Sequence, residues 1–109
     1  YTSLMLIIPG VEDENVRIEE VNMYEMKNGK KIHLVDLNNE TKCSDLLPQF
    51  IYAGTFNYFD LESFLVHLKT KVNWEYPEYV QLIVQEEGAY TCKIYGDAGG
   101  RLDVDSIKC

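Results

Sequence analysis

Residues 57–85, with the sequence NYFDLESFLVHLKTKVNWEYPEYVQLIVQ, decide the fold that this chain is expected to adopt. Apolar side chains recur along the first part of the stretch, at Leu61, Phe64, Leu65, Leu68 and Val72. Residues spaced by three, four, seven and eleven positions lie on the same side of an α-helix. The pattern therefore predicts an amphipathic helix that buries this side.

The signals at the two ends of this helix agree with its periodicity. Asn57 or Asp60 can cap the N-terminus by accepting a backbone N–H bond, and Pro77 cannot continue a helix. Residues 79–84, YVQLIV, are almost all aromatic, aliphatic or β-branched, as is typical of strands. So continuous an apolar run predicts a strand at the centre of a sheet, with the helix lying across it.

The rest of the chain is expected to form strands joined by short turns. The predicted strands are residues 2–8, 16–26, 30–37, 50–56, 89–95 and 102–107. Asn28-Gly29 is typical of a tight hairpin because both residues tolerate positive φ, and a bulge near Glu19-Glu20 would explain the uneven alternation in 16–26. Short connections favour antiparallel pairing. The order ββββαβββ thus predicts a single α+β domain, 1–109, in which one main helix packs on a twisted, mainly antiparallel sheet.

The charge of the chain restricts the kinds of partner that it can have. Its 109 residues include 18 acidic and 10 basic side chains, a net charge of −8, and segments 12–20 and 86–105 contain most of the excess. Phosphate backbones and anionic lipids repel such a chain, so we expect neither nucleic acid nor membrane as partner. A basic protein fits this charge, and solubility alone is the alternative explanation.

The cysteines bear on the compartment in which the protein works. Cys43, Cys92 and Cys109 are too few for a disulfide framework and form no Cys-x-x-Cys pair, which favours reduced thiols and a cytoplasmic protein. The alternative is secretion, because Asn39-Glu40-Thr41 is a glycosylation acceptor. A Cys43–Cys92 or Cys92–Cys109 bridge would then be expected.

No set of residues indicates a chemical reaction. His33 and His67 are isolated histidines, and a serine nucleophile would meet either of them only by accident of folding. Asp97, Asp103 and Asp105 do not have the spacing of a calcium-binding loop. We therefore expect no enzyme, and no metal or cofactor site.

Acidic and aromatic residues occur together near both ends of the predicted helix and after the following strand. Aromatic rings supply contact area at protein interfaces, and carboxylates steer a basic partner and bind its arginines. The alternative is that Trp74 and half of the tyrosines belong to the core and that the acids form a solvated rim. The predicted partner-binding residues are Tyr58, Asp60, Glu62, Trp74, Glu75, Tyr76, Glu78, Glu86 and Glu87.

Residues 60–84, DLESFLVHLKTKVNWEYPEYVQLIV, about a quarter of the chain, resemble the helix-to-strand passage of the barstar family of ribonuclease inhibitors. Glu62 matches the first acidic position of that family's inhibitory helix, and Val66 follows where the family has another acid. The whole chain is similar to small acidic immunity proteins of bacterial toxin systems, including contact-dependent growth inhibition.

This resemblance implies a cytoplasmic immunity protein that binds and occludes a basic toxin, such as a ribonuclease or another nuclease. The alternative function is a secreted, glycosylated binding or structural module with one disulfide.

Overall fold

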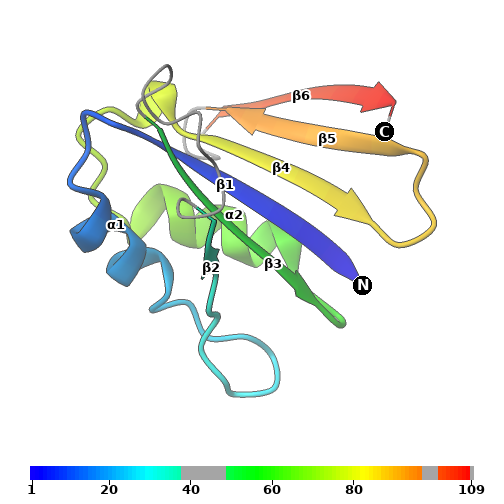
Figure 1. Cartoon of the computed structure of the whole chain (residues 1–109). Coiled ribbons are helices and arrows are strands. Elements are labelled where there is room, and N and C mark those ends of the chain that lie inside the picture. Colours follow the sequence, from blue (N-terminus) through cyan, green and yellow to red (C-terminus); the bar gives the residue numbers. More distant parts are fainter. Residues whose placement is uncertain (38–48, 97–100, 109) are drawn as a thin grey trace.

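The computed structural model describes residues 1–37, 49–96 and 101–108, with the side chains of Gln49 and of 101–108 left out. Its elements are β1 (Thr2–Pro9), α1 (Glu14–Val21), β2 (Val35–Asp36), β3 (Gln49–Phe56), α2 (Leu61–Thr70), the 3-10 helix η2 (Pro77–Tyr79), β4 (Gln81–Glu86), β5 (Thr91–Gly96) and β6 (Arg101–Lys108). Over these residues the protein is an α+β fold (Figure 1). The predicted fold class is confirmed.

All described strand pairs are antiparallel, and the strand order in the sheet is β2-β3-β1-β4-β5-β6. The strand after the helix, β4, lies in the middle beside β1, as predicted. Leu6 of β1 stands opposite Tyr52 of β3 on one side and Leu82 of β4 on the other. Because β3 and β4 both flank β1, they run parallel, and α2 is the crossover that such an arrangement requires.

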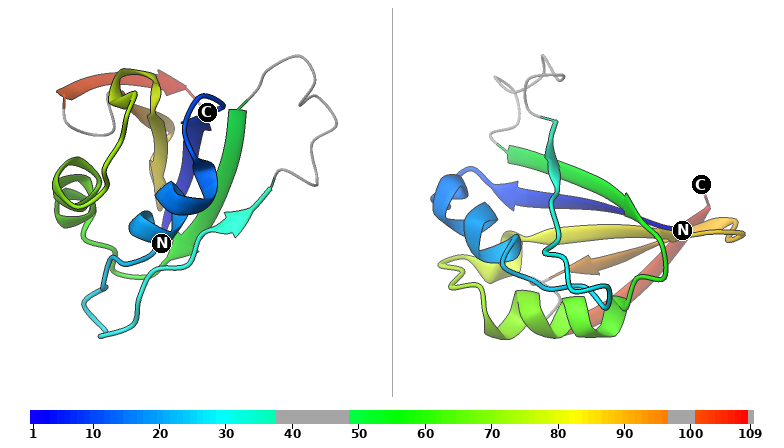
Figure 2. Two further views of the ribbon diagram at one scale, coloured as in Figure 1. Left: turned by 90° about the vertical axis from the view of Figure 1, so that its left-hand side faces the viewer. Right: turned by 90° about the horizontal axis from the view of Figure 1, so that it is seen from below.

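One face of the sheet and the two helices enclose the core. Both α1 and α2 lie on the same face of the sheet (Figure 2). Leu4, Leu6 and Ile8 of β1 point into the core, whereas Met5 between them is exposed on the other face, as the pleat of a strand requires. The apolar stripe of α2 is buried against this face, with Phe64 and Leu68 fully enclosed.

The prediction of a strand over residues 16–26 is wrong, because Glu14–Val21 forms α1. Asp13 caps this helix by accepting a hydrogen bond from the backbone N–H of Val16. Its buried side chains are Arg17 and Val21, which are four residues apart. The uneven alternation was therefore helical periodicity with a charged residue at a buried position, and no bulge lies near Glu19-Glu20.

The turn at Asn28-Gly29 is confirmed, but the two long strands expected beside it are not. Gly29 has a φ of +81°, and its N–H donates to the carbonyl oxygen of Met26 at 2.9 Å. Beyond the turn, a single bridge joins Glu25 to Lys31. Tertiary packing of the 22–34 segment replaces the expected strand ladder: Ile32 and Leu34 are buried in the core.

The ends of α2 follow the sequence signals closely. Asp60 is the N-cap, and its carboxylate accepts a hydrogen bond from the backbone N–H of Ser63 at 3.2 Å. The following strand begins at Gln81 instead of Tyr79, because Pro77 starts the short helix η2. In the described part of the chain, no helix has the length and apolar character needed to cross a membrane.

Candidate protein-binding surface

The predicted partner-binding residues lie at the two opposite ends of α2. The Tyr58 end contains Tyr58, Asp60, Glu62, Glu86 and Glu87, and the Glu75 end contains Trp74, Glu75, Tyr76 and Glu78. Thr2 of β1 stands opposite both Phe56 of β3 and Glu86 of β4, which brings the end of β4 close to the turn before α2. The ten residues of α2 separate the two ends by about 15 Å.

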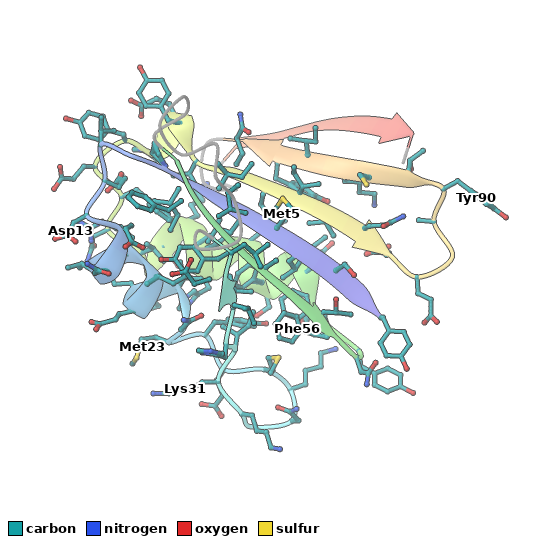
Figure 3. All side chains as sticks on the ribbon, viewed as in Figure 1. Met5, Asp13, Met23, Lys31, Phe56 and Tyr90 are labelled. Atoms are coloured by element: carbon teal, nitrogen blue, oxygen red, sulfur yellow. The ribbon has the colours of Figure 1, made fainter. Side chains whose placement is uncertain are left out.

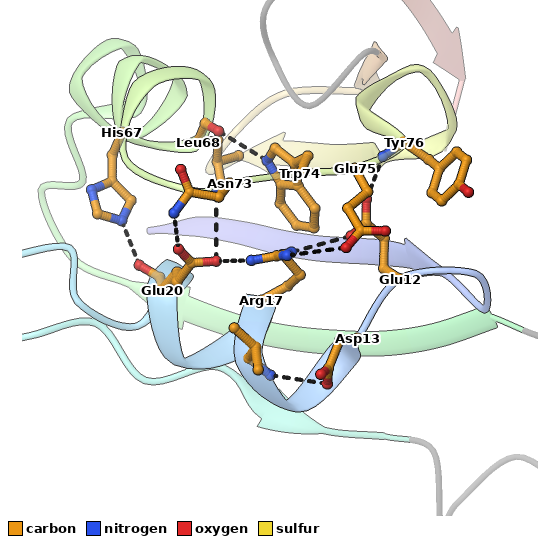
Figure 4. Close-up of polar contacts among 11 residues, drawn as sticks. Glu12, Asp13, Arg17, Glu20, His67, Leu68, Asn73, Trp74, Glu75 and Tyr76 are labelled. Carbon is orange, nitrogen blue, oxygen red and sulfur yellow. Dashed lines mark hydrogen bonds and ion pairs between the residues drawn. The ribbon is translucent and has the colours of Figure 1, made fainter.

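At the Glu75 end, a buried arginine pairs with three carboxylates (Figure 4). The Nε of Arg17 lies 3.1 Å from Glu12 Oε1, its Nη1 pairs with Glu20, and its Nη2 lies 3.8 Å from Glu75 Oε1. The side chain of Glu12 is 0% exposed and that of Arg17 11%. Burial by itself would lower the pKa of Arg17, but the hydrogen bonds and charges of Glu20 and Glu12 raise this pKa above its ordinary value.

The same network joins α1 to the chain that leaves α2. Glu12 Oε2 accepts the backbone N–H of Tyr76 at 2.6 Å, and Glu20 Oε2 accepts the side-chain amide of Asn73 at 2.7 Å. The indole N–H of Trp74 donates to the carbonyl oxygen of Leu68 at 2.9 Å. These contacts hold the helices together (Figure 4), so at this end much of the acid and aromatic composition has a structural role.

Some side chains at the Glu75 end still face solvent. Tyr76 and Tyr79 are exposed and stack on each other, with ring centroids 6.4 Å apart. Glu78 is exposed as well, whereas Trp74 is half-buried. This end therefore keeps a small exposed aromatic and acidic area beside its internal network.

At the Tyr58 end, one aromatic residue is both strained and exposed. Tyr58 is 93% exposed and has a φ of +53°, and among the described residues it is the one non-glycine residue with positive φ. This conformation is unfavourable for a bulky side chain, and residues held under such strain cluster at functional sites. Tyr90, on the turn between β4 and β5, also projects from the molecule (Figure 3), but without positive φ.

Adjoining hollows surround the turn that contains Tyr58. A hollow of about 390 Å³ is lined by Tyr24, Met26, Lys27, Tyr58, Phe59 and Asp60, together with Asn28 and Asn57. Another of about 460 Å³ shares Lys27, Phe59 and Asp60 with it and extends to Glu62, Glu86 and Lys93. A third, of about 310 Å³, lies between Tyr58 and Glu87. The sequence predicted the acids here but not Met26, Phe59 or the two lysines, which only the packing brings to the site.

The charges at the Tyr58 end are mixed, with acids in excess. Glu62 and Glu86 are exposed. One carboxylate oxygen of Asp60 accepts the N-cap hydrogen bond from Ser63. Glu87 is exposed as well. Lys27 and Lys93 offset part of the negative charge.

The prediction of reduced thiols is contradicted at one position, because Cys92 is disulfide-bonded. Its candidate partners in the sequence, Cys43 and Cys109, and the glycosylation triplet at Asn39 lie outside the described residues. Cys92 lines a hollow of about 410 Å³ on the face of the sheet opposite the helices, together with Met5, Ala53 and Ile83. Cys92 belongs to both bridges expected for the secreted alternative, but spacing along the sequence does not show which cysteines come close in space.

The ring of His67 makes its contacts within the fold. The Nε2 of His67 lies 2.9 Å from the carbonyl oxygen of Glu20, and its ring packs against Tyr24 and Phe64. Within the described ranges, no group of histidine, cysteine, aspartate and glutamate side chains is arranged to hold a metal ion.

No protein-family model, no curated protein and no solved structure matches this chain. Its fold and surface define an acidic α+β domain with exposed aromatic and acidic residues at both ends of one helix.

Proposed function

We propose that this protein binds a basic protein at its Tyr58 end and blocks that protein's activity. The observation that carries the proposal is the placement of Tyr58, which is strained, almost fully exposed and lines two hollows, one with Asp60 and Lys27 on its rim and one with Glu87. An exposed ring in an unfavourable backbone conformation gains little from folding, so contact with a partner is the physical reason to keep it.

The Tyr58 end is a better binding surface than the Glu75 end because its acids are less engaged within the chain. Glu62 and Glu86 face solvent on the rim of a hollow. By contrast, Glu12 and Glu20 are bound to Arg17 inside the protein. Carboxylates that are free to bind an incoming arginine add to affinity, and those already paired do not.

An immunity protein that occludes a basic toxin, such as a nuclease, is the form of this function that we favour. The net charge of −8 would attract a basic toxin over long distances and speed its association. The resemblance of residues 60–84 to ribonuclease inhibitors supports the same function, and Glu62, which carries that resemblance, lies at the Tyr58 end. In this form the protein acts in the cytoplasm by binding, with no catalytic step.

The test is co-purification with the product of the adjoining reading frame, followed by binding measurements on two charge-reversed variants. Glu62→Lys with Glu86→Lys changes the Tyr58 end, and Glu19→Lys with Glu78→Lys changes one exposed acid of α1 and one of the Glu75 end. Both pairs change the net charge equally, so both should slow association to a similar degree. Only the first pair should also speed dissociation. If its carboxylates meet buried arginines of the partner, the binding free energy should weaken by about 2–5 kcal/mol in total. Equal losses from both pairs would exclude the Tyr58 end as the binding surface.

The second candidate function, a secreted binding or structural module, is favoured by the disulfide at Cys92. Disulfides persist in oxidising compartments and are rare in the cytosol. Thiol titration in denaturant distinguishes the two candidates: a secreted module that keeps the bridge at Cys92 should show one free thiol, whereas three free thiols would show that the bridge does not form and would favour a cytoplasmic inhibitor. A count of three would remove the support for secretion.

A further inference from the structure

We infer that the hollow beside Tyr58 receives an arginine side chain of the partner protein. This inference rests on the proposed function and names the chemical group that the site recognises. The hollow, of about 390 Å³, falls within the usual range of ligand-binding pockets. Its walls are mainly apolar and its rim is polar, which suits a side chain with an aliphatic stem and a charged, planar head.

The walls of the hollow are held in place by the core. Tyr24 is buried, and its hydroxyl donates to the carbonyl oxygen of Asp60 at 3.4 Å. Phe59 stacks on Phe56 at 5.4 Å between ring centroids and meets Tyr24 edge-on at 6.0 Å. With the thioether of Met26, these rings form a preformed apolar wall. The three methylene groups of an arginine stem pack well on such a surface.

The rim provides what a guanidinium group requires. Asp60 supplies a carboxylate, one oxygen of which caps α2, and in the adjoining hollow Asp60, Glu62 and Glu86 outnumber Lys27 and Lys93. The exposed ring of Tyr58 offers a face on which a planar guanidinium can stack. The compact ammonium group of a lysine stacks less well and cannot form paired hydrogen bonds with a carboxylate, so arginine is preferred.

Lys27 allows the sign of the ligand's charge to be tested. It is exposed and lines both the 390 Å³ hollow and the acidic hollow next to it. Its positive charge opposes an incoming guanidinium, so Lys27→Gln should tighten arginine binding. An anionic group in the same hollow would be held by Lys27, and the same variant would then weaken binding.

Tyr58→Gly separates binding from folding. Glycine adopts a φ of +53° without strain, and the tyrosine ring is almost fully exposed, so this variant should melt at the same or a higher temperature. Loss of ligand binding in a fully folded Tyr58→Gly variant would then measure the contribution of the tyrosine ring to binding. Tyr90→Ala is the matched control, because it removes an exposed tyrosine from a turn that lacks the strain.

The experiment is an NMR titration of the ¹⁵N-labelled protein with N-acetyl-arginine amide, N-acetyl-lysine amide and N-acetyl-tyrosine amide. The arginine probe should shift the amide signals of residues 26–28 and 57–60 at millimolar concentration, and the lysine probe should shift them several-fold less. Tyr58→Gly should abolish the shifts, Tyr90→Ala should preserve them, and Lys27→Gln should tighten binding several-fold.

Equal shifts with the lysine probe, stronger shifts with the tyrosine probe, or weaker binding by Lys27→Gln would each overturn the inference. These outcomes are distinguishable from failure of the proposed function. If the arginine probe does not bind here, yet Glu62→Lys with Glu86→Lys still weakens binding of the protein partner, only the arginine site is wrong.

Discussion

At the C-terminal end of α2, acids and aromatic rings bind other parts of the chain, whereas at its N-terminal end the same kinds of side chain face solvent. Glu12 and Glu20 enclose Arg17, and the indole of Trp74 donates to a helix carbonyl. Tyr58 and Glu62 have no comparable role in packing, since both are exposed. Composition alone therefore does not distinguish a structural polar network from a set of exposed residues that can bind a partner.

The largest expected effect comes from breaking the network at the Glu75 end with Arg17→Met. This change would leave the fully buried carboxylate of Glu12 without its cationic partner, which should lower the free energy of unfolding by about 3–5 kcal/mol. Urea denaturation would measure the loss. Lys69→Met is the matched control because Lys69 is exposed on α2, and a loss of similar size there would contradict a structural role specific to Arg17.

A smaller effect is expected from the apolar stripe that connects the two ends. Leu65→Ala removes a buried side chain and should lower the free energy of unfolding by about 2–5 kcal/mol. Val66→Ala, on the exposed side of the same helix, should change it by less than about 0.5 kcal/mol. Similar values for the two variants in thermal or chemical unfolding would show that the helix faces are assigned wrongly.

Gly29→Val should destabilise the turn beside the Tyr58 end by more than about 1 kcal/mol, because a β-branched residue is strained at a φ of +81°. A side chain at Gly29 would meet no atom within 4 Å, so the cost is one of backbone conformation. Gly96→Val is the control, since Gly96 has equally open surroundings and no positive φ. Equal melting temperatures of Gly29→Val and the parent protein would contradict the positive φ assigned to Gly29 in this turn.

The smallest expected effect has the opposite sign. Tyr58→Gly should leave the free energy of unfolding unchanged or raise it by under about 1 kcal/mol, because it relieves a strained φ and removes little packing. Tyr90→Gly should give no such gain. A clear loss of stability in Tyr58→Gly, measured by calorimetry, would mean that the ring packs within the protein and would weaken the comparison between the two ends.

Local signals in the sequence determined much of the fold. The apolar spacing of Leu61 to Val72 predicted α2, and Asp60 was one of the two caps proposed for it. The strand at residues 50–56 and the turn at Gly29 also follow from nearby residues alone. These features could be predicted because helix periodicity, capping and turn conformation depend on residues a few positions apart.

Tertiary structure decided the features that depend on residues far apart in the chain. Arg17 occupies a buried position of α1 only because Glu12 and Glu20 surround it, so its charge concealed the helix from the sequence pattern. Pairing of β1 with β3 and β4 brings Glu86 near Tyr58, although 28 positions separate them in the sequence. The hollows, the strain at Tyr58 and the bond at Cys92 likewise arise from packing, since burial and contact are set by the folded chain as a whole.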